Sequence, residues 1–204
     1  MIVGRSALLA SLICSAGPGI AVAQDAAASF RYDGRDLSIR QSATVDPASI
    51  VPFLRREEGC DDPCVAPLSA GDGIATVDEL TVLGFLRGAV ARGDGLLIDA
   101  RSPDRRSQGA IPASVNVPVT LLGADNPYRV EILLALGARE MEGAFNFADA
   151  LPLTIYDDGP ATFDAPRMIA TLADLGYPVD RLSYYRGGLR DWAALGLTIE
   201  GARE

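Results

Sequence analysis

The sequence contains no histidine and no lysine, because all 18 of its basic residues are arginine. The chain therefore offers no imidazole for general-base catalysis and no amine for a Schiff base, which leaves carboxylates and tyrosines for acid–base chemistry. Positive charge is scarce overall, and the net charge is −9. This balance argues against nucleic acid and against anionic membrane surfaces as partners, and it does not identify the protein or small molecule that is the partner.

Beyond residue 23 the sequence also has no apolar run of the roughly 20 residues that a membrane-spanning helix needs. Residues 1–23 have the features of a signal peptide. Arg5 supplies a positive start, an apolar stretch follows, and Ala21-Val22-Ala23 is an A-x-A cleavage signal. We therefore predict an exported, periplasmic protein that is cleaved near Ala23 and has no membrane span after cleavage.

Cysteine is rare, with three residues in the chain. Cys14 lies in the predicted signal peptide, so Cys60 and Cys64 remain in the mature protein. In an oxidising compartment this C-x-x-x-C pair is most simply a local disulfide, and a redox or sulfur-accepting pair is the alternative. Two thiolates without histidine make only half a zinc site. We expect neither a metal nor a cofactor.

A length of 204 residues suits one domain with additions. Residues 24–72 form an N-terminal extension that is too small for a core of its own. We expect it to pack on the domain formed by residues 73–204. Within the extension, Asp33-Gly34 lies between two partly alternating runs and predicts a hairpin, and a short helix is expected within residues 50–56.

From residue 73 onwards strand-like and helix-like patterns alternate, which favours a parallel sheet covered by helices on both faces. Thr76 and Glu79 have the spacing of a capping box before the first helix, and Pro166 is expected to open a later helix. A short apolar run predicts a strand at residues 96–98, and further short strands are expected at residues 114–117, 151–156 and 182–185. Functional sites of such sheets lie at the carboxyl ends of the strands. The candidate positions are residues 99–101, 157–162 and 186–188.

Three stretches, in the correct order, resemble elements of the rhodanese family. Residues 97–101 and 109–118 look like the family's "D-x-R … G-H-I-P-G-A-x-N-x-P" element, with Ala110 where histidine is usual. Residues 153–162 look like the central strand and the loop that follows it. Residues 185–197 look like the closing "G-G-x-x-x-W-x-x-x-G" element.

The resemblance implies a rhodanese-like α/β fold with an open five-stranded parallel sheet and helices on both faces. In active members the loop after the central strand begins with cysteine. Backbone N–H groups of that loop form an anion cradle at a helix N-terminus, where the thiolate carries sulfur. The corresponding residues here are Asp157, Asp158, Gly159, Pro160, Ala161 and Thr162.

Asp157 takes the place of the catalytic cysteine in this comparison. A carboxylate cannot store sulfur as a persulfide, so the substitution removes the sulfurtransferase mechanism rather than weakening it. We predict a degenerate loop with no catalytic residue, in a protein that acts as a binding or accessory module.

Three other functions stay open. The Cys60–Cys64 pair could exchange disulfides or accept sulfur if it lies near the loop. Asp157 could be the nucleophile of a phosphatase-like enzyme, although aspartyl-phosphate chemistry usually needs Mg²⁺ and a separate acid. Asp157, Asp158 and Asp164 could instead hold Ca²⁺ or Mg²⁺ through their oxygens.

Four residues beside these strand ends and the loop are expected to rim a pocket and bind an anion or a partner: Asp99, Arg101, Arg167 and Arg186. The alternative for Arg101 and Arg186 is an ion pair with Asp99 or another neighbour. The stretch at residues 60–67 is similar to a subgroup of exported bacterial rhodanese-like proteins. That finer resemblance implies a role beside periplasmic oxidative metabolism.

Overall fold

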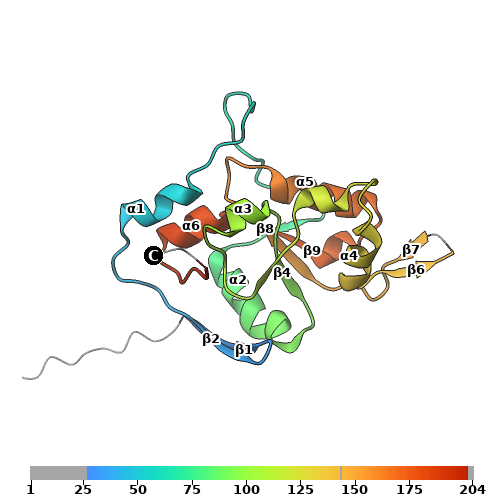
Figure 1. Cartoon of the computed structure of the whole chain (residues 1–204), viewed down its shortest axis with the longest axis horizontal. Coiled ribbons are helices and arrows are strands. Elements are labelled where there is room, and N and C mark those ends of the chain that lie inside the picture. Colours follow the sequence, from blue (N-terminus) through green and yellow to red (C-terminus); the bar gives the residue numbers. More distant parts are fainter. Residues whose placement is uncertain (1–26, 143, 202–204) are drawn as a thin grey trace, which may run out of the picture.

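The computed structural model describes residues 27–142 and 144–201. Its centre is a five-stranded sheet in which all neighbouring strands are parallel (Figure 1). The order across the sheet is β3 (Ala75–Thr76), β9 (Leu182–Tyr185), β8 (Leu153–Tyr156), β4 (Leu96–Asp99) and β5 (Ser114–Asn116). The expected open five-stranded parallel sheet is confirmed, and β8 is its central strand.

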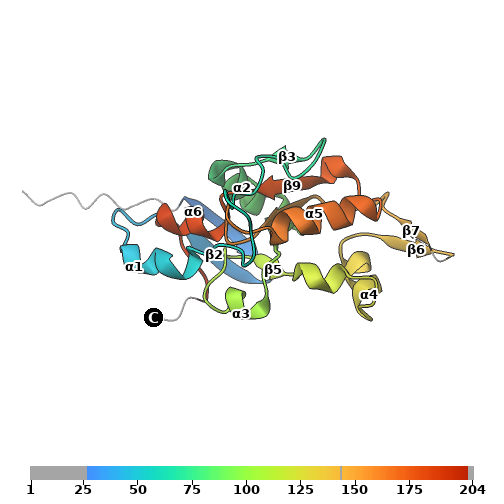
Figure 2. The same cartoon turned by 90° about the horizontal axis from the view of Figure 1, so that it is seen from above.

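Successive side chains of the strands enter two different hydrophobic cores, because a strand turns them to opposite faces of the sheet. Leu97 and Tyr156 belong to one core, and their neighbours Ile98 and Ile155 belong to the other. Helices cover both faces (Figure 2). On the Ile98 face lie α4 (Arg129–Ala135) and α5 (Asp164–Asp174), and on the Leu97 face lie α2 (Glu79–Phe85) and α6 (Gly188–Ala194).

Several short elements complete the chain. The helical ones are α1 (Pro47–Ile50), η1 (Val51–Phe53), the π-helical turn η2 (Leu86–Val90), α3 (Pro103–Arg106), η3 (Val119–Leu122) and η4 (Val179–Arg181). A small antiparallel hairpin is formed by β6 (Arg139–Met141) and β7 (Ala144–Asn146). The sequence did not predict this hairpin, because its strands have three residues each and are mostly exposed.

The N-terminal extension packs on the domain, as expected for a segment without its own core. Its hairpin joins β1 (Ala28–Tyr32) to β2 (Arg35–Ile39) through Asp33 and Gly34, which both have positive φ. This backbone twist is the one that favours Asp-Gly in two-residue hairpins. Ile39 and Phe53 are buried in the same core as Trp192. The extension therefore becomes part of the Leu97 face of the domain.

Two predicted helix starts are wrong. Asp78, and not Thr76, caps α2, since its side chain accepts a hydrogen bond from Thr81 N at 2.9 Å. Thr76 instead pairs with β9 as part of β3, which commits its backbone to the sheet. Helix α5 begins at Asp164, before Pro166. Helix α5 ends with Leu175 as its C-cap, and Gly176, which follows it, has the positive φ that is common just after a helix.

The signal peptide predicted at residues 1–23 lies outside the described residues. Within the part of the chain that the structure describes, no helix is long and apolar enough to cross a membrane.

Candidate functional site

The loop after β8 runs from Asp157 to Thr162 and leads into α5. The side chain of Asp157 is fully buried, and its carboxyl group turns back into the loop. Its Oδ1 accepts a hydrogen bond from Gly159 N at 3.0 Å, and its Oδ2 accepts one from Ala165 N at 3.0 Å. Both oxygens therefore accept hydrogen bonds from backbone N–H groups beside the N-terminus of α5, where an anion would otherwise bind.

Burial raises the pKa of Asp157 from 3.8 to about 7, because a charged carboxylate loses its hydration inside the protein. The hydrogen bonds from Ala165 N, Gly159 N and Thr162 oppose this rise, and Asp164 adds to it. Asp157 thus differs from a catalytic thiolate in two ways. It cannot hold sulfur, and it carries only part of a negative charge near neutral pH.

This raised pKa predicts how pH affects stability. Between pH 3.8 and about 7 the folded state binds more protons at Asp157 than the unfolded chain does, so this residue makes the free energy of unfolding fall as pH rises. Asp157→Asn does not titrate. We expect its free energy of unfolding, relative to wild type, to rise by roughly 2–4 kcal/mol between pH 4 and pH 7. Urea unfolding of both proteins at both pH values measures this change. If the difference in free energy of unfolding between variant and wild type is the same at pH 4 and pH 7, the pKa of Asp157 is not raised.

Below the loop, a buried ion network holds Asp158. Its Oδ1 lies 3.0 Å from Arg101 Nη1, and its Oδ2 lies 2.7 Å from Arg105 Nη2 in an ion pair that is not aligned as a hydrogen bond. Arg101 also pairs with Asp99, and Arg105 with Asp164 at 2.8 Å. The network ties the loop to β4, to α3 and to the start of α5.

Asp99 and Arg101, predicted to rim the pocket, are both fully buried beneath the loop. Arg101 Nε and Nη2 donate to the two oxygens of Asp99 at 2.9 and 2.7 Å, a bidentate geometry that suits guanidinium and carboxylate. Buried charges need such partners. The ion pair weighed for Arg101 is therefore present, and a role of these residues in binding an external ligand stays a prediction.

The first turn of α6 lies directly against the loop. The backbone oxygens of Asp157 and Asp158 accept hydrogen bonds from Leu189 N and Arg190 N, both at 3.0 Å. A Cβ added to Gly188 would lie 2.6 Å from the Asp157 oxygen and 2.6 Å from Gly159 N. The absence of a side chain at Gly188 is what allows this close approach.

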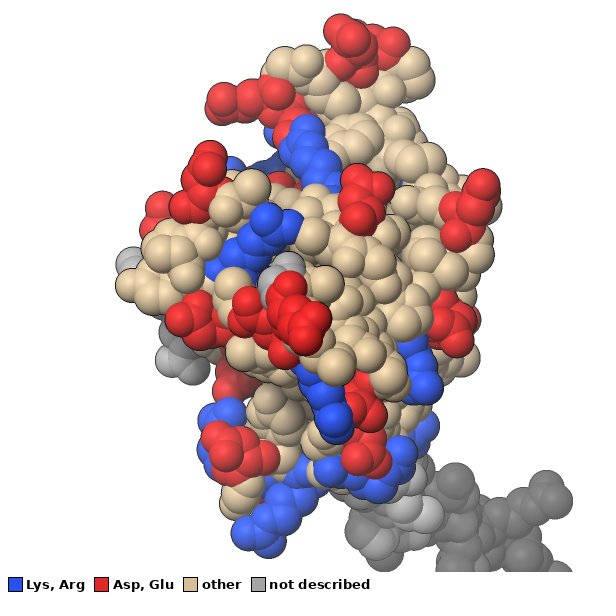
Figure 3. Space-filling model, turned by 90° about the vertical axis from the view of Figure 1, so that its right-hand side faces the viewer, with Lys and Arg blue, Asp and Glu red and all other residues tan. Residues whose placement is uncertain are grey.

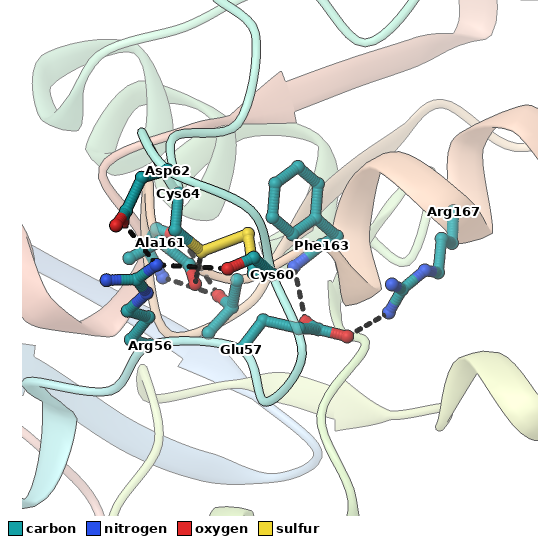
Figure 4. The surroundings of a disulfide bond; sticks show 10 residues. Arg56, Glu57, Cys60, Asp62, Cys64, Ala161, Phe163 and Arg167 are labelled. Atoms are coloured by element: carbon teal, nitrogen blue, oxygen red, sulfur yellow. Dashed lines mark hydrogen bonds and ion pairs between the residues drawn. A yellow bond between two sulfur atoms is a disulfide. The ribbon is translucent and has the colours of Figure 1, made fainter.

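A segment of the N-terminal extension covers the other side of the loop (Figure 4). Glu57 N donates to Ala161 O at 2.8 Å, and Ala66 N donates to Pro160 O at 2.7 Å. The Glu57 side chain accepts a hydrogen bond from Phe163 N at 3.2 Å. We call residues 57–67 the covering segment. The Glu57 carboxylate thus accepts a hydrogen bond from a further backbone N–H group at the N-terminus of α5.

The predicted disulfide between Cys60 and Cys64 is present within the covering segment. Cys64 is buried, and its Sγ lies 3.7 Å from Ala161 O. The pair therefore lies beside the loop. This was the condition for a sulfur-handling or redox role.

The two remaining rim residues, Arg167 and Arg186, hold the covering segment in place. Arg167 Nη1 pairs with Glu57 Oε1 at 2.5 Å. Arg186 Nη2 donates to Ala66 O at 2.9 Å, and its Nε donates to Pro67 O at 3.2 Å. Both arginines contact the covering segment, and their predicted role in binding an anion or a partner stays a prediction.

A hollow of about 230 Å³ remains open beside the loop. Its lining mixes basic and acidic side chains with the last residue of the loop: Arg55, Arg56, Glu57, Glu58, Arg105, Thr162 and Asp164. Among the residues with described positions, no cluster of three or more histidine, cysteine, aspartate or glutamate side chains could hold a metal ion. The calcium or magnesium site considered for Asp157, Asp158 and Asp164 therefore gains no support.

The five-stranded parallel sheet and the loop after its central strand define a rhodanese-like α/β fold, in which both carboxyl oxygens of Asp157 accept hydrogen bonds from backbone N–H groups. Residues 85–195 match the family of the rhodanese-like domain, and the chain belongs to this family. A search of curated proteins finds no match.

Several solved structures are similar to part of this chain. A protein of unknown function from Rhodopseudomonas palustris, a candidate tyrosine phosphatase, is 20% identical over 64% of this chain and 88% of its own, with a TM-score of 0.45. The human single-domain sulfurtransferase is 22% identical over 61% of this chain and 97% of its own, with a TM-score of 0.39. A rhodanese-like domain from Anabaena sp. is 16% identical over 64% and 80%, with a TM-score of 0.40.

The sequence did not reveal two residues of the site, Glu57 and Arg105. Glu57 contacts Phe163 across 106 positions of sequence, and no local pattern marks such a contact. Arg105 had one usable signal: Ser102 precedes it as a helix cap, followed by Pro103. That pattern predicts a short helix after β4, and such a helix would present Arg105 beside the carboxyl end of the sheet.

Proposed function

We propose that this exported rhodanese-like protein does not transfer sulfur through its loop and acts as a binding or accessory module. The observation that carries the proposal is the position of Asp157. Its carboxyl group is buried at the start of the loop and accepts hydrogen bonds from the backbone N–H groups of Gly159 and Ala165. Neither carboxyl oxygen can form the sulfur–sulfur bond on which persulfide chemistry depends.

The covering segment supports the same conclusion. A donor such as thiosulfate is an anion and needs N–H groups at the N-terminus of α5. Glu57 already binds Phe163 N and is itself held by Arg167. A substrate anion would have to displace this carboxylate and would meet Asp164 beside it. The loop is therefore closed both chemically and sterically.

Export is supported by the signal-peptide features of residues 1–23 and by the Cys60–Cys64 disulfide, which suits an oxidising compartment. The net charge of −9 favours a partner other than nucleic acid. On the face seen in Figure 3, acidic and basic side chains are interspersed, and its described residues form no continuous basic patch. The mixed-charge hollow beside Thr162 is the surface where we place a partner.

The test places a cysteine at position 157 and removes the Glu57 side chain that covers the N-terminus of α5. We expect wild type to show no turnover of thiosulfate or mercaptopyruvate with cyanide as acceptor. Asp157→Cys combined with Glu57→Ala should raise turnover from background to a measurable rate, because a thiol then begins the loop and no side chain at position 57 accepts a hydrogen bond from Phe163 N. Asp157→Cys with Glu58→Ala is the matched control, since Glu58 is an exposed neighbour of Glu57. Turnover by wild type would refute the proposal.

A second candidate function uses the cysteine pair to handle sulfur. The observation in its favour is the 3.7 Å separation between Cys64 Sγ and Ala161 O, which places the disulfide on the loop. In that case wild-type activity would depend on the pair. Cys60→Ser/Cys64→Ser would abolish it, while Asp157→Asn would leave it unchanged.

The phosphatase-like alternative has less support. A nucleophilic carboxylate must reach its substrate, but Asp157 is fully buried and both its oxygens accept hydrogen bonds from the loop and α5.

A further inference from the structure

The covering segment meets the loop at its two ends, and the disulfide lies between them. Glu57 is bonded to Ala161 at one end, and Ala66 is bonded to Pro160 at the other. Between these contacts, the residues from Glu58 to Pro63 are exposed, apart from the partly exposed Cys60. The disulfide is thus the covalent link that joins the two anchored ends of the segment.

The two cysteines differ in how accessible they are. Cys64 is 8% exposed and faces the loop, whereas Cys60 is partly exposed. Cys60 also lines a hollow of about 260 Å³ together with Phe163 and Arg167. The hollow gives a thiolate a path to Cys60, while Cys64 is covered by the loop. Thiol–disulfide exchange needs this arrangement, because it depends on access to the sulfur that is attacked.

Further contacts keep the exposed part of the segment in one conformation. Arg56 Nη2 donates to Cys60 O at 3.0 Å and to Asp62 Oδ1 at 2.6 Å. These contacts are exposed and contribute little on their own. The disulfide closes a ring across a sequence separation of only 4. Loss of so small a ring is expected to make local opening about 30-fold more frequent on chain-entropy grounds.

From this arrangement we propose that the Cys60–Cys64 disulfide is a reducible latch that holds the covering segment over the loop. The reactant is a dithiol, either a small molecule or a protein. One of its thiolates attacks Cys60 Sγ, the bond between the two sulfurs breaks, and Cys64 leaves as a thiolate that takes a proton. The second thiol of the reactant then displaces Cys60. The products are two cysteine thiols and the oxidised reactant, so two electrons and two protons are transferred.

Opening the latch uncovers Pro160, Ala161 and the N-terminus of α5. This inference concerns regulation of the loop on which the proposed function rests. The latch is tested by amide hydrogen exchange and the proposed function by sulfur transfer, so either proposal can fail without the other.

Amide hydrogen exchange, measured by NMR on the purified protein before and after reduction with dithiothreitol, tests the latch. We expect the protection of the Glu57 and Ala66 amides to fall about 30-fold on reduction and to return on reoxidation. The Leu189 amide, which donates to Asp157 O within the same loop region, is the internal control and should keep its protection. Cys60→Ser/Cys64→Ser should show the open pattern without any reductant.

Two results would overturn the latch. Unchanged protection of Glu57 and Ala66 in both the reduced protein and the double variant would show that the disulfide does not hold the segment. An equal loss at Leu189 would show that the disulfide supports the whole domain and not one segment. In single variants, Cys60 of Cys64→Ser should react with a thiol reagent faster than Cys64 of Cys60→Ser, and the reverse order would contradict attack at Cys60.

Discussion

Replacing Arg101 with methionine will lower the free energy of unfolding by about 3–5 kcal/mol. Arg101 is fully buried and lies between Asp99 and Asp158. Its guanidinium also donates to Gly109 O at 2.7 Å. Methionine fills a similar volume but leaves two buried carboxylates with fewer donors. Removing one partner from a buried ion network is costly because the remaining charges lose their compensation. Urea unfolding monitored by the fluorescence of Trp192 measures the change.

The matched control is Arg92→Met. Arg92 pairs with Asp94 at 2.9 Å, but both side chains are 64% exposed. Exposed ion pairs contribute about 0–1 kcal/mol, so this variant should unfold close to wild type. A loss at Arg101 no larger than the loss at Arg92 would show that the network beneath the loop is hydrated and does not position Asp158.

The second large effect is expected for Gly188→Ala, which should cost about 2–5 kcal/mol. Gly188 has a φ of +61°, and this conformation costs about 1–2 kcal/mol for a residue with a Cβ. The new methyl group would also meet backbone atoms of Asp157 and Gly159 at 2.6 Å. Backbone cannot yield as a flexible side chain does, so overpacking adds about 1–3 kcal/mol.

Gly93→Ala separates the two causes. Gly93 has a φ of +77°, but a Cβ there would meet no atom within 4 Å. Its cost should therefore be the conformational part alone, about 1–2 kcal/mol. If the two variants unfold alike in urea, close contact between the Gly188 turn and the loop does not stabilise the protein.

Much of the fold could be predicted from local sequence signals. Four of the five strands could be placed from short segments of the sequence, and the apolar run of β4 is the pattern expected of a parallel strand that is buried on both faces. The fifth, β3, has only two residues, which are too few to give a pattern. The start of α2 was misplaced for a related reason. Thr76 fits a capping box in sequence, but the sheet takes its backbone, and Asp78 becomes the cap.

The site was predicted less completely than the fold. The motif places Asp157 and its loop, since the position after the central strand fixes them. Whether a charged residue is exposed at a rim or buried in a network depends on packing that the sequence does not encode locally. Arg101 shows this, because it pairs with Asp158 across 57 positions of sequence. Glu57 shows it again, because its place over the loop depends on how the extension folds back.

The most direct test of the central claim, that this rhodanese-like chain does not act by carrying sulfur, is to measure the mass of the intact wild-type protein. The protein is incubated with thiosulfate, both oxidised and after reduction, and its mass is measured. We predict no gain in mass in either state, because Asp157 cannot form a persulfide and the covering segment only changes access to it. A gain of one sulfur atom would contradict the account, and its location on Cys60 or Cys64 would show that the cysteine pair performs the chemistry.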